Sequence, residues 1–369
     1  MVLKRISLLL TTFFLCQTLI AQPTTTNPEK PADKTEPEIK DPAKEEEIIN
    51  VDDPRWKKAE ITVIGEKKDL KRIPGSATII GKKFLEETRP TDGMEVLRRV
   101  PGANVRYQDA AGLTMNLGFR GISNEVSRKI LVLEDGLFTS LNPYGEPEMY
   151  YAPSIERMER VEIVKGSGSI LFGPSTIGGV VNFITRKPPK DPTLSLQAIG
   201  GENGYVSNMV NYGGTFGNTG FDINVLRKQG DGFRNHQGFW VNEANLKTTH
   251  QLTDKHSITT KVGFHQQESQ ATYIGLTNGM YQHNPKDNPA ENDKRTIERY
   301  SFSLGHEWTL SDHARLITRV YSAYTQRNWA RQEYTRNSSR TTARPTDTLN
   351  TFDGEPYTCL LYTSPSPRD

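Results

Sequence analysis

The stretch that decides the fold is YGEPEMYYAPSIERMERVEIVKGSGSILFGPSTIGGVVNFITR, residues 144–186. Ser154 can cap a short helix over residues 155–158, and two strands are expected at 160–165 and 178–185, with glycine- and serine-rich turns between them. We expect these elements to form a compact β-α-β unit inside a larger domain. The second strand is nearly all apolar, which is typical of a buried strand. Its core residues are expected to be Val180, Val181, Phe183 and Ile184.

The chain before this stretch also has the pattern of short strands and helical turns. Asp92 can cap a helix over residues 93–99, which Pro101-Gly102 would end. A further helical turn is expected at residues 82–87. The expected strands lie at 76–80, 104–107, 115–120 and 129–134. Together with the first stretch, these elements predict an α+β domain over residues 66–188, which is long enough for a modest hydrophobic core.

Five blocks of this domain, in their order and spacing, resemble the plug domain of TonB-dependent outer-membrane receptors. The blocks are PGSATII (74–80), LRRVPGANV (97–105), NLGFRG (116–121), ILVLEDG (130–136) and RMERVEIVKGSGSILFGPSTIGGVVNFITR (157–186). The resemblance implies a transporter in the outer membrane of a Gram-negative bacterium, and not an enzyme. It also implies contact with outer-membrane lipid and a partner, TonB, which the inner-membrane motor ExbB/ExbD drives.

After Pro188-Pro189 the sequence changes to alternating apolar and polar residues with turns, as in the lipid-facing strands of outer-membrane barrels. About seven antiparallel strands are expected, at 193–200, 204–214, 219–229, 239–251, 256–268, 297–310 and 313–326. The receptors that the chain resembles use about 22 strands, and an open sheet edge in lipid leaves costly unpaired backbone groups. Residues 189–358 are therefore expected to be the N-terminal part of a truncated transmembrane β-barrel. A soluble β-sandwich is the alternative.

The N-terminus has the pattern of an export signal over residues 1–21, with Lys4 and Arg5 before an apolar run. Residues 22–59 are rich in Pro, Thr, Glu and Lys and predict a disordered periplasmic linker. Residues 60–65 then form a short β-branched segment where the resemblance implies the TonB box. The residues expected to bind TonB by strand addition are Glu60, Ile61, Thr62, Val63 and Ile64. An ordinary first strand of the next domain is the alternative.

The last segment, CLLYTSPSPRD at residues 359–369, lacks strand alternation. It resembles translated sequencing-adapter read-through, and we expect it to lie outside the native fold. The alternative is a genuine short protein that ends in a loop.

Composition and motifs exclude several functions. The 46 basic and 44 acidic side chains give a net charge of +2, so nucleic acid is not an expected partner. No glycine loop is followed by the lysine of a phosphate-binding loop, and the seven histidines lack metal-ligand spacing. We therefore expect no enzymatic activity and no resident cofactor or metal, because iron would enter only as part of a transported chelate.

Segments near residues 144–160, 230–236 and 268–277 resemble ferric citrate receptors more than the wider family. In those receptors a plug arginine at the position of Arg120 helps to hold the anionic chelate, because a guanidinium suits carboxylates. An ion pair between plug and barrel is the alternative role for Arg120. The expected ligand-binding residues are Arg120, Tyr144, Glu146, Arg327 and Arg331.

One residue departs from the ferric citrate pattern. Glu146 stands where the best-known ferric citrate receptor has glutamine, and its carboxylate would repel an anion unless it were protonated or paired with a cation. Haem, cobalamin or another siderophore therefore stay open as ligands. A binding or adhesion barrel that transports nothing is the alternative from another class.

Overall fold

The computed structural model describes residues 74–140, 149–173, 175–270, 272, 274–276, 278–311, 314–336, 348–350 and 356–363, with side chains up to residue 330 except Leu171. The expected signal, linker and TonB box lie outside the described residues, and so do Tyr144 and Glu146. All described residues belong to one compact unit, residues 49–369.

The first part of this unit, here called the plug region, is a mixed α/β structure built on a five-stranded sheet in the order β1-β6-β7-β4-β5. These strands are β1 (Ser76–Ile80), β6 (Met158–Lys165), β7 (Gly179–Thr185), β4 (Ile130–Glu134) and β5 (Leu137–Phe138). The remaining elements are α1 (Lys82–Thr88), α2 (Gly93–Arg98), the ribbon β2 (Ala103–Val105) with β3 (Leu117–Phe119), and the 3₁₀ turns η3 (Glu125–Ser127), η4 (Ile155–Arg157) and η5 (Ser167–Phe172).

The core of the plug region confirms the sequence analysis. Asp92 caps α2, since its Oδ1 accepts a hydrogen bond of 2.9 Å from the backbone N–H of Glu95. The four predicted core residues of β7 are fully buried. Phe183, one of them, lies under α2, where a Cβ added to Gly93 would be 3.4 Å from its ring. Burial of each such side chain stabilises the fold by about 1.5–3 kcal/mol.

Two local predictions were wrong. The stretch 144–186 does not form a β-α-β crossover, because β6 and β7 pair antiparallel and β7 runs parallel to β4 instead. Gly166 and Gly173 flank η5 with φ of 101° and 103°, a conformation that only glycine adopts readily, and the chain reverses there. Ser154 does not cap the following turn with its side chain. Its hydroxyl donates instead to the carboxylate of Glu243 at 2.7 Å.

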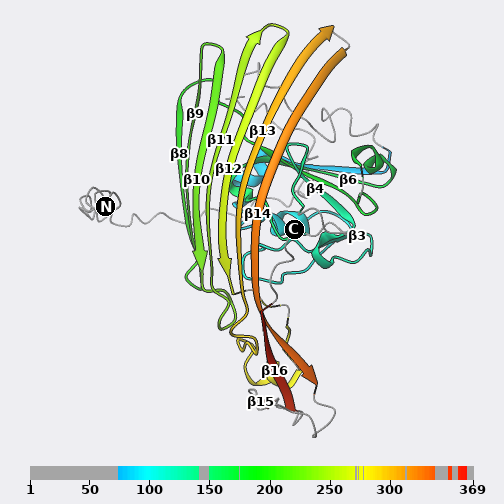
Figure 1. The fold of residues 1–369 in the computed structure, drawn as a ribbon, viewed down its shortest axis with the longest axis vertical. Helices are drawn as coiled ribbons and strands as arrows, with labels where there is room; N and C mark the ends of the chain where they lie inside the picture. The colour runs from blue at the N-terminus through cyan, green and yellow to red at the C-terminus, as the bar shows by residue number, and fades with distance from the viewer. Residues whose placement is uncertain are drawn as a thin grey trace, which may run out of the picture. The chain divides into compact units, whose positions relative to one another are not determined.

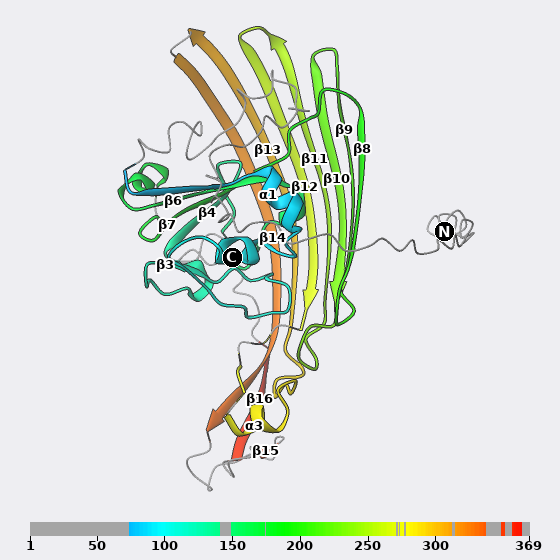
Figure 2. The same cartoon turned by 180° about the vertical axis from the view of Figure 1, so that it is seen from behind.

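The second part is an antiparallel sheet whose seven long strands follow one another in order (Figures 1 and 2). They are β8 (Thr193–Gly200), β9 (Val206–Phe216), β10 (Thr219–Gly230), β11 (Phe239–Thr253), β12 (His256–Ser269), β13 (Lys294–Ser311) and β14 (Ala314–Arg336). Each coincides with a predicted strand, although β14 runs ten residues beyond the predicted end at 326. The short helix α3 (Asn278–His283) lies between β12 and β13.

Two short strands, β15 (Thr348–Asn350) and β16 (Pro356–Thr363), extend this sheet, and β16 pairs with the end of β14. Residues 359–363 therefore take part in strand pairing, whereas the sequence analysis left them outside the fold. The structure does not test whether these residues belong to the native gene, and the read-through origin stays a prediction.

The two faces of the seven-strand sheet differ in chemistry. Apolar side chains such as Leu196, Val320 and Tyr324 are exposed on one face, at 71%, 63% and 64% of their full surface. The other face carries buried polar side chains, among them Lys228, Glu243, Gln267, Arg295 and Arg299. The plug region lies against this polar face (Figures 1 and 2), as the hydrogen bonds described below require.

Candidate functional site

A loop of the plug region between β2 and β3 is fixed by one buried carboxylate. Asp109 accepts backbone N–H groups from Ala111 and Leu113 on Oδ1, at 3.1 and 2.8 Å, and from Thr114 on Oδ2, at 2.8 Å. Arg295 of β13 reaches the same Oδ2 at 3.4 Å and also donates to the hydroxyl of Thr114. The loop is thereby tied to the wall of the sheet.

Apolar contacts support this attachment. Ala111 and Leu113 pack against Phe239 and Val241 of β11, and all four are buried. The loop contacts the first residues of β11, directly after the connection 231–238. Hydrophobic burial and a buried carboxylate therefore hold the loop at one end of the sheet.

Two neighbouring tyrosines of the plug region face a group of arginines on β13 and β14. The guanidinium carbon of Arg327 lies 4.1 Å from the ring centre of Tyr150, and that of Arg299 lies 4.9 Å from the ring centre of Tyr151. Arg327 is opposite Ile297 in the strand register, so Arg295, Arg299 and Arg327 occupy adjacent positions on the polar face. A guanidinium over an aromatic ring is stabilised by about 0.5–2 kcal/mol.

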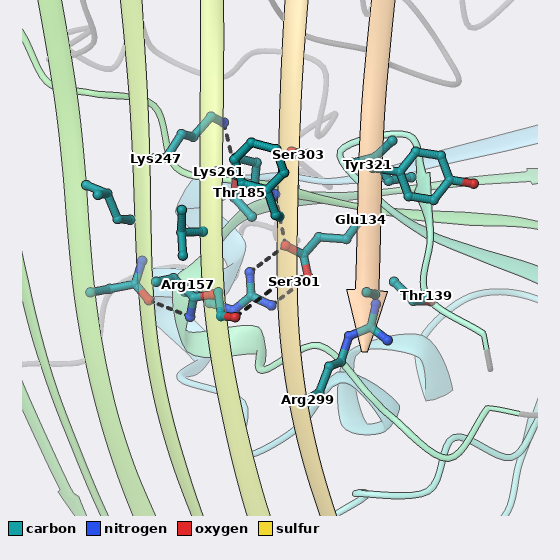
Figure 3. Close-up of a pocket in the computed structure, with 18 of the residues that line it drawn as sticks. Glu134, Thr139, Arg157, Thr185, Lys247, Lys261, Arg299, Ser301, Ser303 and Tyr321 are labelled. Atoms are coloured by element: carbon teal, nitrogen blue, oxygen red, sulfur yellow. Dashed lines mark hydrogen bonds and ion pairs between the residues drawn. The ribbon is translucent and has the colours of Figure 1, made fainter. Parts of the chain in front are cut away.

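Below this arginine group, an ion network joins the plug region to β10, β11 and β12. Arg157 donates to both carboxylate oxygens of Glu134, at 2.8 and 2.6 Å (Figure 3). It also donates to Glu243 of β11 at 3.2 Å. Glu243 also accepts from His265 at 2.7 Å and from Ser154. The side chain of Arg157 is 3% exposed and that of Glu243 is 1% exposed, so this is a buried salt bridge with both partners hydrogen-bonded.

The network continues along the sheet through two lysines. Lys261 contacts Glu134 at 2.9 Å and Asp135 at 2.7 Å, and Lys247 lies 3.5 Å from Asp135 and 3.0 Å from the hydroxyl of Thr185. A separate pair, Lys228 with Glu156 at 3.2 Å, joins β10 to the plug region. With this pair counted as part of the network, its four cations are paired with four carboxylates. The cations are Arg157, Lys228, Lys247 and Lys261, and the carboxylates are Glu134, Asp135, Glu156 and Glu243.

The charges of the network set the ionisation of the plug carboxylates. Burial alone would raise the pKa of Glu134, but Arg157 and Lys261 outweigh burial and hold that pKa well below its usual range. Burial acts in the same way on Asp135, and Lys247 and Lys261 lower its pKa below the usual range. Both groups are therefore ionised at any pH at which the protein works.

A cavity of about 70 Å³ lies where this network meets β12, β13 and β14 (Figure 3). The residues that line it on the plug side include Glu134, Thr139, Tyr151 and Arg157. Lys247, Lys261, Arg299, Ser301 and Ser303 line it from the sheet. The lining also includes apolar side chains such as Leu137 and Phe138. Among its charged residues, cations outnumber the carboxylates Glu134 and Asp222, which suits water or an anion.

The structure brings only part of the predicted ligand site together. Arg327 lies in the arginine group beside Tyr150, and Arg331 is in β14 opposite Tyr362, although its side chain is not described. Arg120 lies elsewhere, exposed at the end of β3, with its backbone N–H bonded to Gly102 and its guanidinium close to Gly166. Among the described residues it forms no ion pair with the sheet.

The sequence analysis missed Arg295, Arg299 and the partners of Arg157. A signal for the two arginines was present in the sequence, because they continue the alternation of β13 on the same face as Ser301 and Ser303. Nothing in the local sequence pairs Glu243 with Arg157, since that contact depends on packing of distant segments.

The described residues contain neither a membrane-spanning helix nor a metal-ligand cluster. No helix there is long and apolar enough to cross a membrane. Within the same residues, no three His, Cys, Asp or Glu side chains gather so that they could hold a metal ion.

Comparison with protein families matches residues 69–180 to the TonB-dependent Receptor Plug Domain. Among curated proteins, the chain is 28% identical over 165 residues to the vitamin B12 transporter BtuB of Photobacterium profundum, which covers 44% of this chain and 26% of the relative. It is 32% identical over 143 residues to an iron-regulated outer membrane virulence protein of Vibrio cholerae, which covers 37% and 21%. The alignments thus span about a quarter of the length of these relatives.

Solved structures show the same fold over more of the chain. The unliganded ferric citrate transporter FecA matches with a TM-score of 0.65 and 24% identity, covering 73% of this chain and 44% of that one. BauA, the ferric preacinetobactin receptor of Acinetobacter baumannii, matches with a TM-score of 0.59 and 19% identity, covering 74% and 40%.

These matches confirm the predicted fold class and location. TonB-dependent receptors lie in the outer membrane of Gram-negative bacteria, which confirms the predicted location. Proteins of that family are transporters and not enzymes, in agreement with the prediction from the sequence. Residues 69–180 match the TonB-dependent receptor plug domain, and with the seven-strand antiparallel sheet that follows them they match part of a TonB-dependent receptor.

Proposed function

We propose that the protein imports a ferric chelate, ferric citrate or a related carboxylate siderophore, across the outer membrane. The ligand binds on the outer side, between the plug region and the loops of the sheet. TonB, driven by ExbB/ExbD and the inner-membrane proton-motive force, then pulls on the plug. No bond of the substrate is made or broken.

The observation that carries this proposal is the arginine group at one end of the sheet. In outer-membrane barrels, short turns face the periplasm and long loops face outward. Here two residues, 217–218, join β9 to β10, whereas residues 270–293 join β12 to β13. The end with Arg295, Arg327 and Tyr150 is therefore the outer end, and guanidinium groups there suit the carboxylates of an anionic chelate.

The structural similarity to the ferric citrate transporter FecA supports this ligand class. Cobalamin is the second candidate, favoured by the sequence similarity to the vitamin B12 transporter BtuB. A polyanionic chelate needs cationic side chains in its binding site more than cobalamin does. The arginine group therefore favours the ferric chelate over cobalamin.

Coupling to TonB is assigned to residues 60–65, with Glu60, Ile61, Thr62, Val63 and Ile64 pairing as an added strand. These residues lie outside the described part of the chain. Deletion of residues 60–65 from the full-length gene tests the proposal. Uptake of iron-labelled ferric citrate by cells should be lost, while purified receptor should bind ferric citrate as before. Uptake that survives this deletion would exclude TonB-dependent import through this segment.

The ligand is tested by quenching of tryptophan fluorescence in the purified receptor. Trp329 is a built-in reporter, because its ring contacts Tyr150 with centroids 6.2 Å apart, beside Arg327. Ferric citrate should quench, whereas ferric catecholates, haem and cyanocobalamin should not. Equal quenching by all ligands, or quenching by cyanocobalamin alone, would contradict a carboxylate chelate.

A pair of variants locates the binding site. Arg327→Gln should weaken ferric citrate binding about tenfold, the value of charged hydrogen bonds lost from a bound carboxylate. Arg315→Gln is the matched control, because Arg315 lies on the same strand near its other end and pairs with Glu307 at 3.0 Å. An equal loss in both variants would show that strand damage, and not ligand contact, weakens binding.

A further inference from the structure

We propose that Arg299, the member of the arginine group that lies deepest along β13, forms a second carboxylate-binding subsite below Arg295 and Arg327, inside the protein between the plug region and β13–β14. One carboxylate arm of the imported chelate would occupy it after leaving the outer site. The inference rests on the proposed function, and it adds a position on the route that the ligand takes past the plug.

Arg299 is buried but has few partners. Its side chain is 8% exposed, one guanidinium nitrogen donates to the hydroxyl of Thr325 at 3.0 Å, and the ring of Tyr151 lies beneath the group. A guanidinium has five N–H donors in a fork that matches a carboxylate. Among the described residues, no carboxylate lies within ion-pair distance of Arg299, and most of its donors are therefore available to a ligand.

The neighbouring Arg157 differs from Arg299, because carboxylates neutralise its charge. Both arginines contact Tyr151, Arg157 through the hydroxyl at 2.9 Å and Arg299 through the ring face. Arg157 has two carboxylate partners, Glu134 and Glu243, and the neighbouring lysines have the rest. Since the four cations of the network already face its four carboxylates, Arg299 adds a positive charge that the network does not neutralise.

The cavity beside Arg299 gives an anion room to bind. Its volume of about 70 Å³ admits a few water molecules or one small anionic group. Ser303 and Lys261 line it, and so do Thr139 and Ser301, whose hydroxyl groups donate to the backbone oxygens of Val132 and Gly263. In Figure 3, Arg299 lies below Glu134 and no contact joins the two, whereas Arg157 is connected to Glu134. The guanidinium of Arg299 and the hydroxyl of Ser303, beside the positive charge of Lys261, are the donors that a carboxylate would meet there.

A buried unpaired charge costs free energy, which an anion would recover on binding. The size of the cavity restricts the resting site to a single carboxylate arm. The whole chelate could pass only when the plug moves, so the subsite acts during transport and not in first recognition.

The test uses the purified full-length receptor and iron-free citrate as probe. Millimolar citrate should raise the melting temperature of the wild-type protein and of Arg327→Gln, in which the outer site is damaged. It should not raise that of Arg299→Gln. Arg299→Lys keeps the positive charge but lacks the forked donors of a guanidinium, and it should recover part of the increase in melting temperature. This variant also controls for misfolding of Arg299→Gln.

Uptake separates this subsite from the outer site. Arg299→Gln should lower the rate of ferric citrate uptake about tenfold, with surface binding of ferric citrate unchanged. The proposal is overturned if Arg299→Gln keeps wild-type uptake and the citrate shift, or if it loses surface binding in parallel with uptake. If wild-type cells take up no ferric citrate, the proposed function fails. The subsite is then still tested by whether citrate raises the melting temperature of the wild type and not that of Arg299→Gln.

Discussion

The plug region and the seven-strand sheet bury opposite kinds of side chain. In the plug region, Val161, Ile163 and Phe183 are fully buried, as in a soluble domain. In the sheet, the buried side chains include Lys228 and Glu243, whereas apolar ones are exposed on the far face. The difference teaches that the two parts are built for different surroundings: the polar face of the sheet contacts the plug region, and we expect its apolar face to contact outer-membrane lipid.

The same difference decides which interactions hold the two parts together. The plug has its own hydrophobic core, and its contact with the sheet relies mainly on buried ion pairs and hydrogen bonds. A pulling force must break these contacts before the plug can move. Because an ion pair is strong only when both partners are present, removal of one partner is the most effective way to weaken the attachment.

The largest effect is expected for Glu243→Ala. This change leaves Arg157 and His265 without a shared carboxylate and should cost about 3–5 kcal/mol. It should lower the melting temperature of the purified protein and expose the plug to protease. A melting temperature equal to that of wild type would show that the network does not hold the plug.

The matched control is Glu268→Ala, near the end of β12 in the same sheet. Glu268 pairs with Lys294 at 2.9 Å, but their side chains are 33% and 51% exposed. Such a pair contributes about 0–1 kcal/mol. If the two variants lost equal stability, the contrast between buried and exposed pairs would not hold.

The next effect tests the lipid face. Val262, in the middle of β12, is 48% exposed and lies between Leu246 and Phe302 of the neighbouring strands. Val262→Arg should reduce the unfolding free energy in lipid vesicles by about 2–4 kcal/mol, because a charge at the bilayer midplane is poorly solvated. Gln266→Arg, on the same face near the strand end, should cost about 0–1 kcal/mol. Equal costs would mean that this face is not in the hydrocarbon.

The sequence predicted the sheet well because alternation of period two is a local property. Strands β8 and β12, for example, begin at the predicted residues 193 and 256. The end of β14 was placed too early, since polar residues on both faces hide the alternation near Arg327. Long strands that extend beyond the apolar belt are therefore the part of such a sheet most easily underestimated.

The candidate site was harder to predict because it is made of distant pairs. Ser154 was assigned to a helix cap, but a buried carboxylate on another segment is a better acceptor for its hydroxyl. Arg120 and Arg327 were expected to act together, yet one contacts the backbone near Gly102 and the other contacts Tyr150. Only the register of β13 and β14 shows that Arg295 and Arg299 join Arg327.

The smallest expected effect compares two buried carboxylates of the plug region. Salt bridges lower the pKa of Glu134, whereas burial raises the pKa of Asp92 to about 6, against the opposing influence of the hydrogen bond from Glu95 and the charge of Lys228. The folded protein therefore binds a proton at Asp92 between about pH 4 and 6, where the unfolded chain, with its ordinary pKa of 3.8, does not. Stability from this group is present at low pH and is lost as pH rises through about 6.

The variant Asp92→Asn isolates that dependence, because asparagine keeps the acceptor oxygen that caps α2 but cannot ionise. Between pH 5 and 7, wild type should lose about 1 kcal/mol of stability relative to Asp92→Asn. The measurement is the difference between the melting temperatures of the two proteins at each pH. Groups that titrate in both proteins cancel in this difference. Parallel curves would mean that Asp92 is ionised in the folded protein like Glu134, and that the charge of Lys228 and the hydrogen bond from Glu95 outweigh burial there.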